Sequence, residues 1–122
     1  MSGAPLVILV DDDASMARAM GRILEVGGMR PLAFSSAEAL LAHLPADAEG
    51  IVIDVQLPGM DGLALYRKLR ALGAAYPAVF VSAQHEAEAR VRALDPSCVF
   101  LEKPFAGRVL LEAMKRLLDE AA

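Results

Sequence analysis

Short apolar runs alternate with longer amphipathic stretches five times along the chain. The runs are rich in β-branched residues and free of charge, which is typical of strands buried on both faces of a sheet. One run follows Pro31, and a proline at this place favours the edge of a sheet. The predicted strands cover residues 6–10, 32–34, 51–53, 78–81 and 99–101.

Between these runs, apolar residues recur three or four positions apart, which is the spacing of one helix face. The sequence therefore predicts five helices, each with an apolar side turned toward the sheet. The positions expected to face the core are Met16, Met20, Ile23 and Leu24; Leu40, Leu41 and Leu44; Leu65, Leu69 and Leu72; Ala87, Val91 and Leu94; and Leu110, Met114 and Leu117.

Polar residues mark where several of these helices begin and end. Ser35 and Glu38 have the spacing of a capping box, so Ser35 is predicted to cap the second helix. Asp13 and Asp61 are expected at the starts of the first and third helices, where a carboxylate suits the exposed backbone N–H groups. Pro96 predicts an early end for the fourth helix, because the residue before a proline avoids helical backbone.

The alternation of strand and helix predicts an α/β fold. Right-handed crossovers place consecutive strands parallel, with helices on both faces of a doubly wound five-stranded sheet. No linker, repeat or low-complexity segment interrupts the pattern, so residues 1–122 are interpreted as one domain. Ligands of such sheets bind outside the carboxyl ends of the strands, and these ends are where we look for chemistry.

The amino-acid composition excludes several classes of protein. With 56% apolar residues and a mean hydropathy of +0.42, the chain is too apolar to be disordered. Twelve basic against sixteen acidic residues leave a net charge of −4, which argues against direct binding of nucleic acid. The longest apolar run is five residues, too short for a membrane span, and the N-terminus lacks the basic start of a signal peptide. The single cysteine, Cys98, excludes a disulfide framework and is expected to be buried in a cytoplasmic protein.

Acidic residues gather at two predicted strand ends. Asp11, Asp12 and Asp13 follow the first strand, and Asp54 directly follows the buried run 51–53. The triplet alone fits a solvated turn or helix cap as well as it fits a binding site. Asp54 differs, because an unpaired carboxylate after a buried run is costly. Two carboxylates 4 Å apart repel by about 4 kcal/mol at an effective dielectric of about 20. The cluster therefore predicts a divalent cation, and oxygen ligands alone favour Mg²⁺, with Mn²⁺ as a substitute.

Two further residues extend this cluster into a site for a phosphoryl group. Ser82 ends the fourth strand and Lys103 follows the fifth, so both reach the same edge of a parallel sheet. A cation, an ammonium and a hydroxyl together neutralise the oxygens of a transferring phosphoryl group. A carboxylate would then be the nucleophile and carry the product as an aspartyl phosphate.

Four motifs stand at the predicted strand ends: Val-Asp-Asp-Asp at 10–13, Ile-Asp-Val-Gln-Leu-Pro-Gly-Met-Asp-Gly at 53–62, Val-Ser-Ala at 81–83 and Leu-Glu-Lys-Pro-Phe at 101–105. Together they resemble the receiver domain of two-component response regulators, most closely those of the nitrogen-fixation type. The resemblance implies a flavodoxin-like strand order, 2-1-3-4-5. It implies that Asp54 accepts the phosphoryl group and that Asp11, Asp12 and Asp54 bind Mg²⁺. Asp12 would be the direct ligand of the acidic pair, and the backbone carbonyl of Gln56 a further one.

The resemblance also assigns the switch residues. Ser82 and Ala83 would lie at the phosphate, Lys103 would bind one of its oxygens, and Phe100 matches an aromatic position that rotates on activation. A cis peptide is expected between Lys103 and Pro104.

From the residues themselves, Gln56 and Gln84 are expected at the rim of the site. Each lies two positions past a pocket residue, where an amide can hydrogen-bond or obstruct an attacking water without acting as a base. We therefore expect both to tune the lifetime of the phosphorylated state.

Receivers of this family take their phosphoryl group from a sensor histidine kinase or a histidine phosphotransfer protein. Many then form homodimers through the fourth helix, fifth strand and fifth helix.

Two features depart from the family pattern: Ser82 stands where threonine is commoner, and Asp95-Pro96-Ser97-Cys98 replaces a turn of small residues. The fourth helix is therefore expected to be short or loosely held. The sequence leaves open whether the chain is a complete regulator or a fragment of a DNA-binding one.

Two alternatives stay open on the sequence alone. Asp11 and Asp13 also resemble the nucleophile motif of haloacid-dehalogenase phosphatases, with Asp11 as nucleophile and Asp13 as acid/base. The second alternative is a binding module that works without phosphorylation. His43 and His85 have no partner arrangement for phosphohistidine chemistry and are expected at the surface, as is Glu102.

Overall fold

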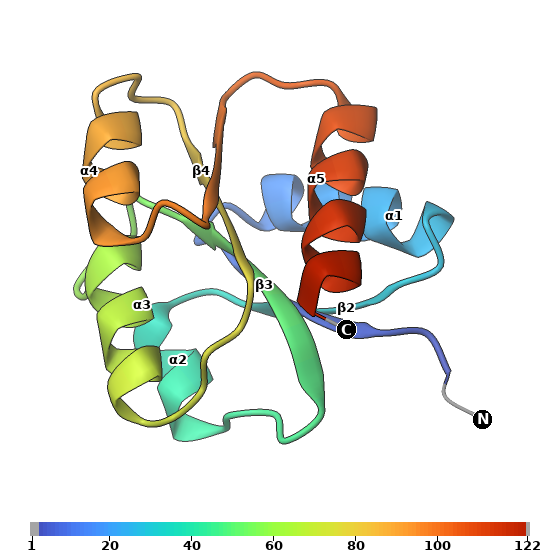
Figure 1. The fold of residues 1–122 in the computed structure, drawn as a ribbon, viewed down its shortest axis with the longest axis horizontal. Coiled ribbons are helices and arrows are strands. Elements are labelled where there is room, and N and C mark those ends of the chain that lie inside the picture. The colour runs from blue at the N-terminus through green and yellow to red at the C-terminus, as the bar shows by residue number, and fades with distance from the viewer. Residues whose placement is uncertain (1–2, 122) are drawn as a thin grey trace.

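Five parallel strands form a single sheet in the order β2-β1-β3-β4-β5, which confirms the predicted fold class and strand order (Figure 1). The computed structural model describes residues 3–121. The strands are β1 (Leu6–Val10), β2 (Arg30–Phe34), β3 (Ala48–Asp54), β4 (Ala78–Ser82) and β5 (Val99–Glu102). Two of them end on residues predicted for the site, since Asp54 closes β3 and Ser82 closes β4.

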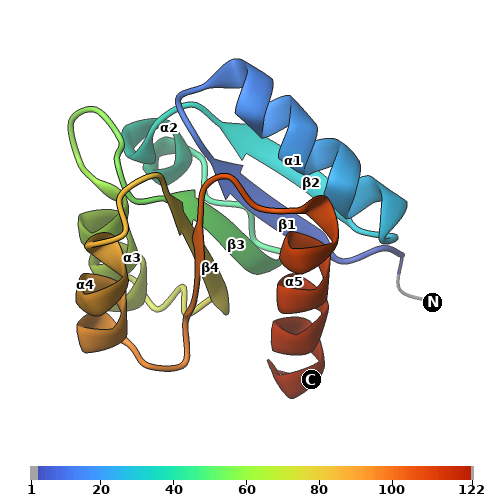
Figure 2. The ribbon, with the colours of Figure 1, turned by 90° about the horizontal axis from the view of Figure 1, so that it is seen from above.

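The helices form a layer on each face of this sheet. Helices α1 and α5 cover one face, and α2, α3 and α4 cover the other (Figure 2). Within the described residues, none of these helices has the length and apolar character needed to cross a bilayer. The helices are α1 (Ala14–Val26), α2 (Ala37–Ala42), α3 (Gly62–Ala71), α4 (Ala87–Leu94) and α5 (Gly107–Ala121).

The strands at the centre of the sheet supply both cores. Successive side chains of a strand point to opposite faces, so Ile51 and Ile53 pack with α2, α3 and α4 while Val52 packs with α1 and α5. Every residue of β1 and β4 is buried, which explains their continuous apolar runs. Strand β2 is an edge strand, as Pro31 indicated, and its Leu32 is exposed.

Two details of the helix ends differ from the sequence-based expectations. Ser36, not Ser35, caps α2, because Ser36 has the extended backbone of a cap and its Oγ accepts from the backbone N–H of Ala39 at 3.0 Å. Leu72 does not face the core: α3 ends at Ala71, so Leu72 lies past the last turn and is 55% exposed. The expectations for Asp13 and Asp61 are confirmed, since both carboxylates accept backbone N–H groups at the starts of α1 and α3.

Gly62 lets α3 start directly against the end of β3. A Cβ atom at this position would lie 2.4 Å from the carbonyl oxygen of Asp54 and 2.8 Å from Cγ2 of Ile53. The backbone N–H of Gly62 donates to the carbonyl of Val55 at 3.0 Å. The backbone that carries Asp54 is therefore fixed by direct contact with the first residue of α3.

The C-terminal end of α4 is held to α3 by a polar network. The hydroxyl of Tyr66 donates to Oδ2 of Asp95 at 2.7 Å, and Nη1 of Arg70 donates to the same oxygen at 2.7 Å. The other oxygen, Oδ1, accepts from the backbone N–H of Ser97 at 2.9 Å and from its Oγ at 2.7 Å. Helix α4 is short, as expected, but this network shows that its last turn is not loosely held.

Hydrogen bonds from the Ser97 and Tyr66 side chains lower the pKa of Asp95 from 3.8 to about 2. A lowered pKa in the folded state means that the charged carboxylate stabilises the fold above the unfolded value, and that this contribution is lost as pH falls toward 2. We expect Asp95→Asn to destabilise the protein near neutral pH and to cost progressively less between about pH 5 and about pH 3. Urea unfolding of both proteins across this range measures the difference.

Asp47 is exposed, and within residues 3–121 its one ion pair is with Arg30 at 3.6 Å, so it provides the matched control. Asp47→Asn is expected to change the free energy of unfolding by less than about 1 kcal/mol, as for surface ion pairs in general. An Asp95→Asn penalty that stays constant as the pH is lowered would contradict the role given to the Asp95 charge.

Gly62→Ala is expected to destabilise the protein by about 1–3 kcal/mol, because the added methyl group meets backbone atoms that cannot move aside cheaply. Gly21→Ala in α1 is the matched substitution, since a Cβ there meets only ordinary contacts of 3.6 Å or more. It is expected to be neutral or to stabilise by up to about 1 kcal/mol through helix propensity. Equal effects of the two substitutions in urea unfolding would argue against the close approach at Gly62.

Candidate functional site

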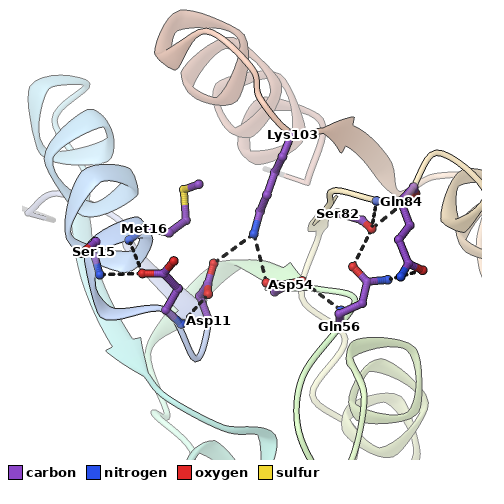
Figure 3. Close-up of polar contacts among 9 residues, drawn as sticks. Asp11, Ser15, Met16, Asp54, Gln56, Ser82, Gln84 and Lys103 are labelled. Atoms are coloured by element: carbon purple, nitrogen blue, oxygen red, sulfur yellow. Dashed lines mark hydrogen bonds and ion pairs between the residues drawn. The ribbon is translucent and has the colours of Figure 1, made fainter.

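The polar side chains at the strand ends converge on one edge of the sheet (Figure 3). Asp54 is 6% exposed and Asp11, just past β1, is 2% exposed. Lys103, just past β5, reaches between them: its Nζ lies 3.1 Å from Oδ2 of Asp54 and 3.6 Å from Oδ2 of Asp11. The parallel register brings these residues together, because β1 pairs with β3 through Val10 and Ile53.

Three carboxylates share this edge. One oxygen from each of Asp11, Asp12 and Asp54 lies within 4.8 Å of the other two. Asp12 is exposed, and a surface groove along α1 and β2 opens onto Asp11 and Asp12. One ammonium leaves this group of three carboxylates with an excess of negative charge.

The hydrogen bonds of Asp11 leave one oxygen for a further ligand. Its Oδ1 accepts from the backbone N–H of Asp13 at 2.8 Å, whereas Oδ2 is buried and has no hydrogen-bond partner among the described residues. The ion pair with Lys103, at 3.6 Å, is too long for a hydrogen bond. A buried unpaired oxygen inside an all-oxygen donor set fits a hard divalent cation such as Mg²⁺.

The pKa shifts follow from this crowding. Burial raises the pKa of Asp11 above its ordinary value, and the hydrogen bond from Asp13 and the charge of Lys103 offset only part of that rise. Burial alone would lower the pKa of Lys103, but its hydrogen bond to Asp54 and the two nearby carboxylates raise the pKa overall. The lysine is therefore held as an ammonium at the centre of the site.

The hydroxyl of Ser82 lies on the far side of Asp54 from Asp11 (Figure 3). Ser82 is fully buried, and its Oγ donates to Oε1 of Gln56 at 2.6 Å while accepting from the backbone N–H of Gln84 at 2.9 Å. Nε2 of Gln56 donates to Oε1 of Gln84 at 3.3 Å, and the backbone N–H of Gln56 donates to Oδ1 of Asp54 at 2.9 Å. Both glutamines thus lie at the rim of the site.

Other residues singled out in the sequence take different places. Ala83 is exposed in the turn after β4, and Phe100 is half-buried in β5 and packs against the core formed with α2, α3 and α4. The peptide between Lys103 and Pro104 is cis. Asp13 does not join the carboxylates, because it accepts the backbone N–H groups of α1.

Two interactions that frame the site were missed by sequence reasoning. Glu38 on α2 does not close a capping box: its Oε2 accepts from the backbone N–H of Met60 at 3.1 Å and so holds the loop after β3. His85 and Glu102 are exposed, as expected, but they pair at 2.9 Å, and this pairing raises the pKa of His85. Of these two interactions, only the pair of His85 and Glu102 could have been expected from the strand register. Glu102 lies opposite Ser82 in the sheet, and His85 follows closely after Ser82 in the chain.

Comparison with known proteins identifies the family. A model of the response regulator receiver domain matches residues 7–115. The chain is 43% identical over 118 residues to the C4-dicarboxylate transport transcriptional regulatory protein DctD of Rhizobium meliloti, covering 95% of this chain and 26% of DctD. It is 33% identical over 117 residues to the transcriptional regulatory protein FixJ of Bradyrhizobium diazoefficiens, covering 94% of this chain and 57% of FixJ.

Solved structures agree with this match. A CheY-like receiver domain protein from Methanospirillum hungatei superposes with a TM-score of 0.85 at 28% identity, covering 97% of this chain and 96% of that one. The chain spans about a quarter of DctD and somewhat over half of FixJ. Neither the phosphatase nor the phosphorylation-independent module is favoured by these matches. The chain belongs to the family of response regulator receiver domains, and is therefore a signalling domain of the two-component type.

Proposed function

We propose that residues 1–122 form a receiver domain in which Asp54 accepts the phosphoryl group. The observation that carries this proposal is the 3.1 Å contact between Lys103 and Asp54, beside the unpaired oxygen of Asp11. Asp54 has the Lys103 ammonium on one side and Ser82 on the other, so groups suited to bind phosphoryl oxygens flank it. Asp12 is exposed, and the ion pairs of Lys103 are with Asp11 and Asp54 instead.

The donor is the phosphohistidine of a sensor histidine kinase or of a histidine phosphotransfer protein. An oxygen of Asp54 forms the new bond to phosphorus as the bond to the imidazole nitrogen breaks, and the donor keeps the electron pair of that bond. Mg²⁺, or Mn²⁺ in its place, would be held by Asp11, Asp12, Asp54 and the backbone carbonyl of Gln56, and would neutralise phosphoryl oxygens. Lys103 holds another oxygen through its ammonium.

The same site supports weak reactions without a partner. A small phosphodonor can reach Asp54 through the open side at Asp12, and water can later hydrolyse the acyl phosphate. The amides of Gln56 and Gln84 lie on the other side of Asp54, beside Ser82, where they hinder approaching water without removing a proton from it. They therefore set the lifetime of the phosphorylated state.

Phosphorylation adds negative charge next to Ser82 and Ala83. The Ser82 hydroxyl moves toward the phosphoryl group, and Phe100 rotates in the space that this movement opens. The affected surface is formed by α4, β5 and α5, where the domain forms a homodimer or binds its output partner. The domain works in the cytoplasm, contacts no membrane and does not bind nucleic acid directly.

Intact-mass spectrometry with a small phosphodonor and Mg²⁺ tests the acceptor. The protein is expected to gain the mass of a single phosphoryl group, and Asp54→Ala is expected to gain none because it lacks the nucleophile. Asp13→Ala, which removes a carboxylate outside the cluster, is the control and is expected to be labelled. Normal labelling of Asp54→Ala would refute the assignment and make Asp11 the candidate.

Mg²⁺ binding is expected to depend on Asp12 far more than on Asp13. Asp12→Asn and Asp13→Asn each remove a single negative charge, so they match in long-range electrostatics. Only Asp12 belongs to the carboxylate cluster, and Asp13 is engaged by the N–H groups of α1. We expect calorimetric titration to show about a tenfold or greater loss of affinity for Asp12→Asn. Equal losses in both variants would contradict the proposed ligand set.

A further inference from the structure

The hydroxyl of Ser82 already has an acceptor in this structure. A hydroxyl has a single hydrogen to donate, and the short contact of the Ser82 hydroxyl is with Oε1 of Gln56 at 2.6 Å, whereas the backbone carbonyl of Gln84 lies farther away, at 3.4 Å (Figure 3). The hydroxyl oxygen accepts from the backbone N–H of Gln84, so the donor and one acceptor position are both in use. Ser82 cannot donate to a phosphoryl oxygen on Asp54 while this bond to Gln56 is made.

The side chain of Gln56 is held in place to accept this bond. Its amide Nε2 donates to Oε1 of Gln84, and its backbone N–H donates to Oδ1 of Asp54. One residue therefore contacts the acceptor carboxylate through its backbone and the switch hydroxyl through its side chain. The backbone contact with Asp54 positions the Cα of Gln56, and the side-chain oxygen Oε1 of Gln84 orients the Gln56 amide.

The two partners of this hydrogen bond, Ser82 and Gln56, differ in how deeply they are buried. Ser82 is fully buried, so its hydroxyl must find an acceptor in the protein or on a bound phosphoryl group. Gln56 is only half-buried, and its Oε1 can accept from water once Ser82 leaves. The bond therefore costs about the net value of a neutral hydrogen bond to break, about 0.5–1.5 kcal/mol, rather than the full desolvation of a buried group.

We infer that Gln56 is a positioning residue: its side chain holds Ser82 away from Asp54 and lowers the affinity of the site for a phosphoryl group. This inference rests on the proposed function, because it concerns the same acceptor and the same hydroxyl. The two states, with Ser82 bonded to Gln56 or to the phosphoryl group, exclude each other. Stabilising the first state therefore weakens phosphate binding, because it lowers the fraction of molecules in which Ser82 is free to donate to the phosphoryl group.

Gln56→Met removes the acceptor oxygen while keeping a side chain of similar length and the backbone carbonyl proposed for Mg²⁺. The probe is beryllofluoride, which mimics a phosphoryl group on a carboxylate, titrated at saturating Mg²⁺ and followed by fluorine NMR. We expect Gln56→Met to bind beryllofluoride about two- to tenfold more tightly than the unaltered protein, the range that a neutral hydrogen bond gives. Mg²⁺ affinity is measured for each variant, so that a change there is corrected for.

Ser82→Ala provides the matched background. Without the hydroxyl there is nothing for Gln56 to hold, so adding Gln56→Met to Ser82→Ala is expected to leave beryllofluoride affinity unchanged. Gln56→Glu extends the cycle, since its carboxylate accepts a stronger bond and also adds charge. The effect of the added charge on beryllofluoride affinity is the same in the Ser82→Ala background, so it cancels when the two backgrounds are compared. The remaining difference measures the hydrogen bond, and we expect it to weaken beryllofluoride binding when Ser82 is present.

The outcomes separate this inference from the proposed function. If Gln56→Met has the same effect with and without the Ser82 hydroxyl, or weakens binding only when that hydroxyl is present, the positioning role is wrong. If the unaltered protein does not bind beryllofluoride, or Asp54→Ala binds it equally well, the proposed acceptor itself is wrong. Tighter binding that depends on Ser82, together with loss of binding in Asp54→Ala, supports both.

Discussion

Repulsion among three carboxylates is the constraint around which this domain is built. One oxygen each of Asp11, Asp12 and Asp54 lies within 4.8 Å of the others, and a single ammonium, that of Lys103, lies among them. At an effective dielectric of about 20, each close pair of carboxylates costs about 4 kcal/mol. Free side chains would separate, so the backbone must hold them together. The excess negative charge that results favours a divalent cation at the proposed metal site.

The parallel sheet supplies that restraint. Strands β1 and β3 are neighbours whose apolar side chains are buried on both faces, so their carboxyl ends cannot move apart without exposing both cores. Gly62 adds a second restraint, because α3 packs directly on the backbone of Asp54. The hydroxyl side of the site is held differently: the side chains of Ser82, Gln56 and Gln84 hold one another by hydrogen bonds that exchange at modest cost. One side of the site is therefore rigid, and the other can rearrange.

Local patterns predicted most of the framework, because apolar runs and helical spacing record which faces are buried. They also predicted that Asp11, Asp54 and Lys103 meet, since parallel strands end at a common edge. Local patterns failed where a residue's partner is distant in the chain. Glu38 contacts Met60, and Tyr66 contacts Asp95, in each case through atoms that no short motif connects. The cap of α2 is Ser36 and not Ser35, and the sequence could not separate these two adjacent serines because the choice depends on their backbone angles.

These contacts give the two ends of α4 different stabilities. At the N-terminal end, no side chain among the described residues caps the helix. The loop before it is held by the exposed pair of His85 and Glu102, and such surface pairs contribute little stability in water. The C-terminal end is fixed to α3 by Tyr66 and Arg70 through Asp95. A displacement that began at Ser82, as proposed above, would reach α4 at its weakly held end. The polar network on Asp95 would hold the other end, and so restrict the displacement to the part of α4 that precedes its last turn.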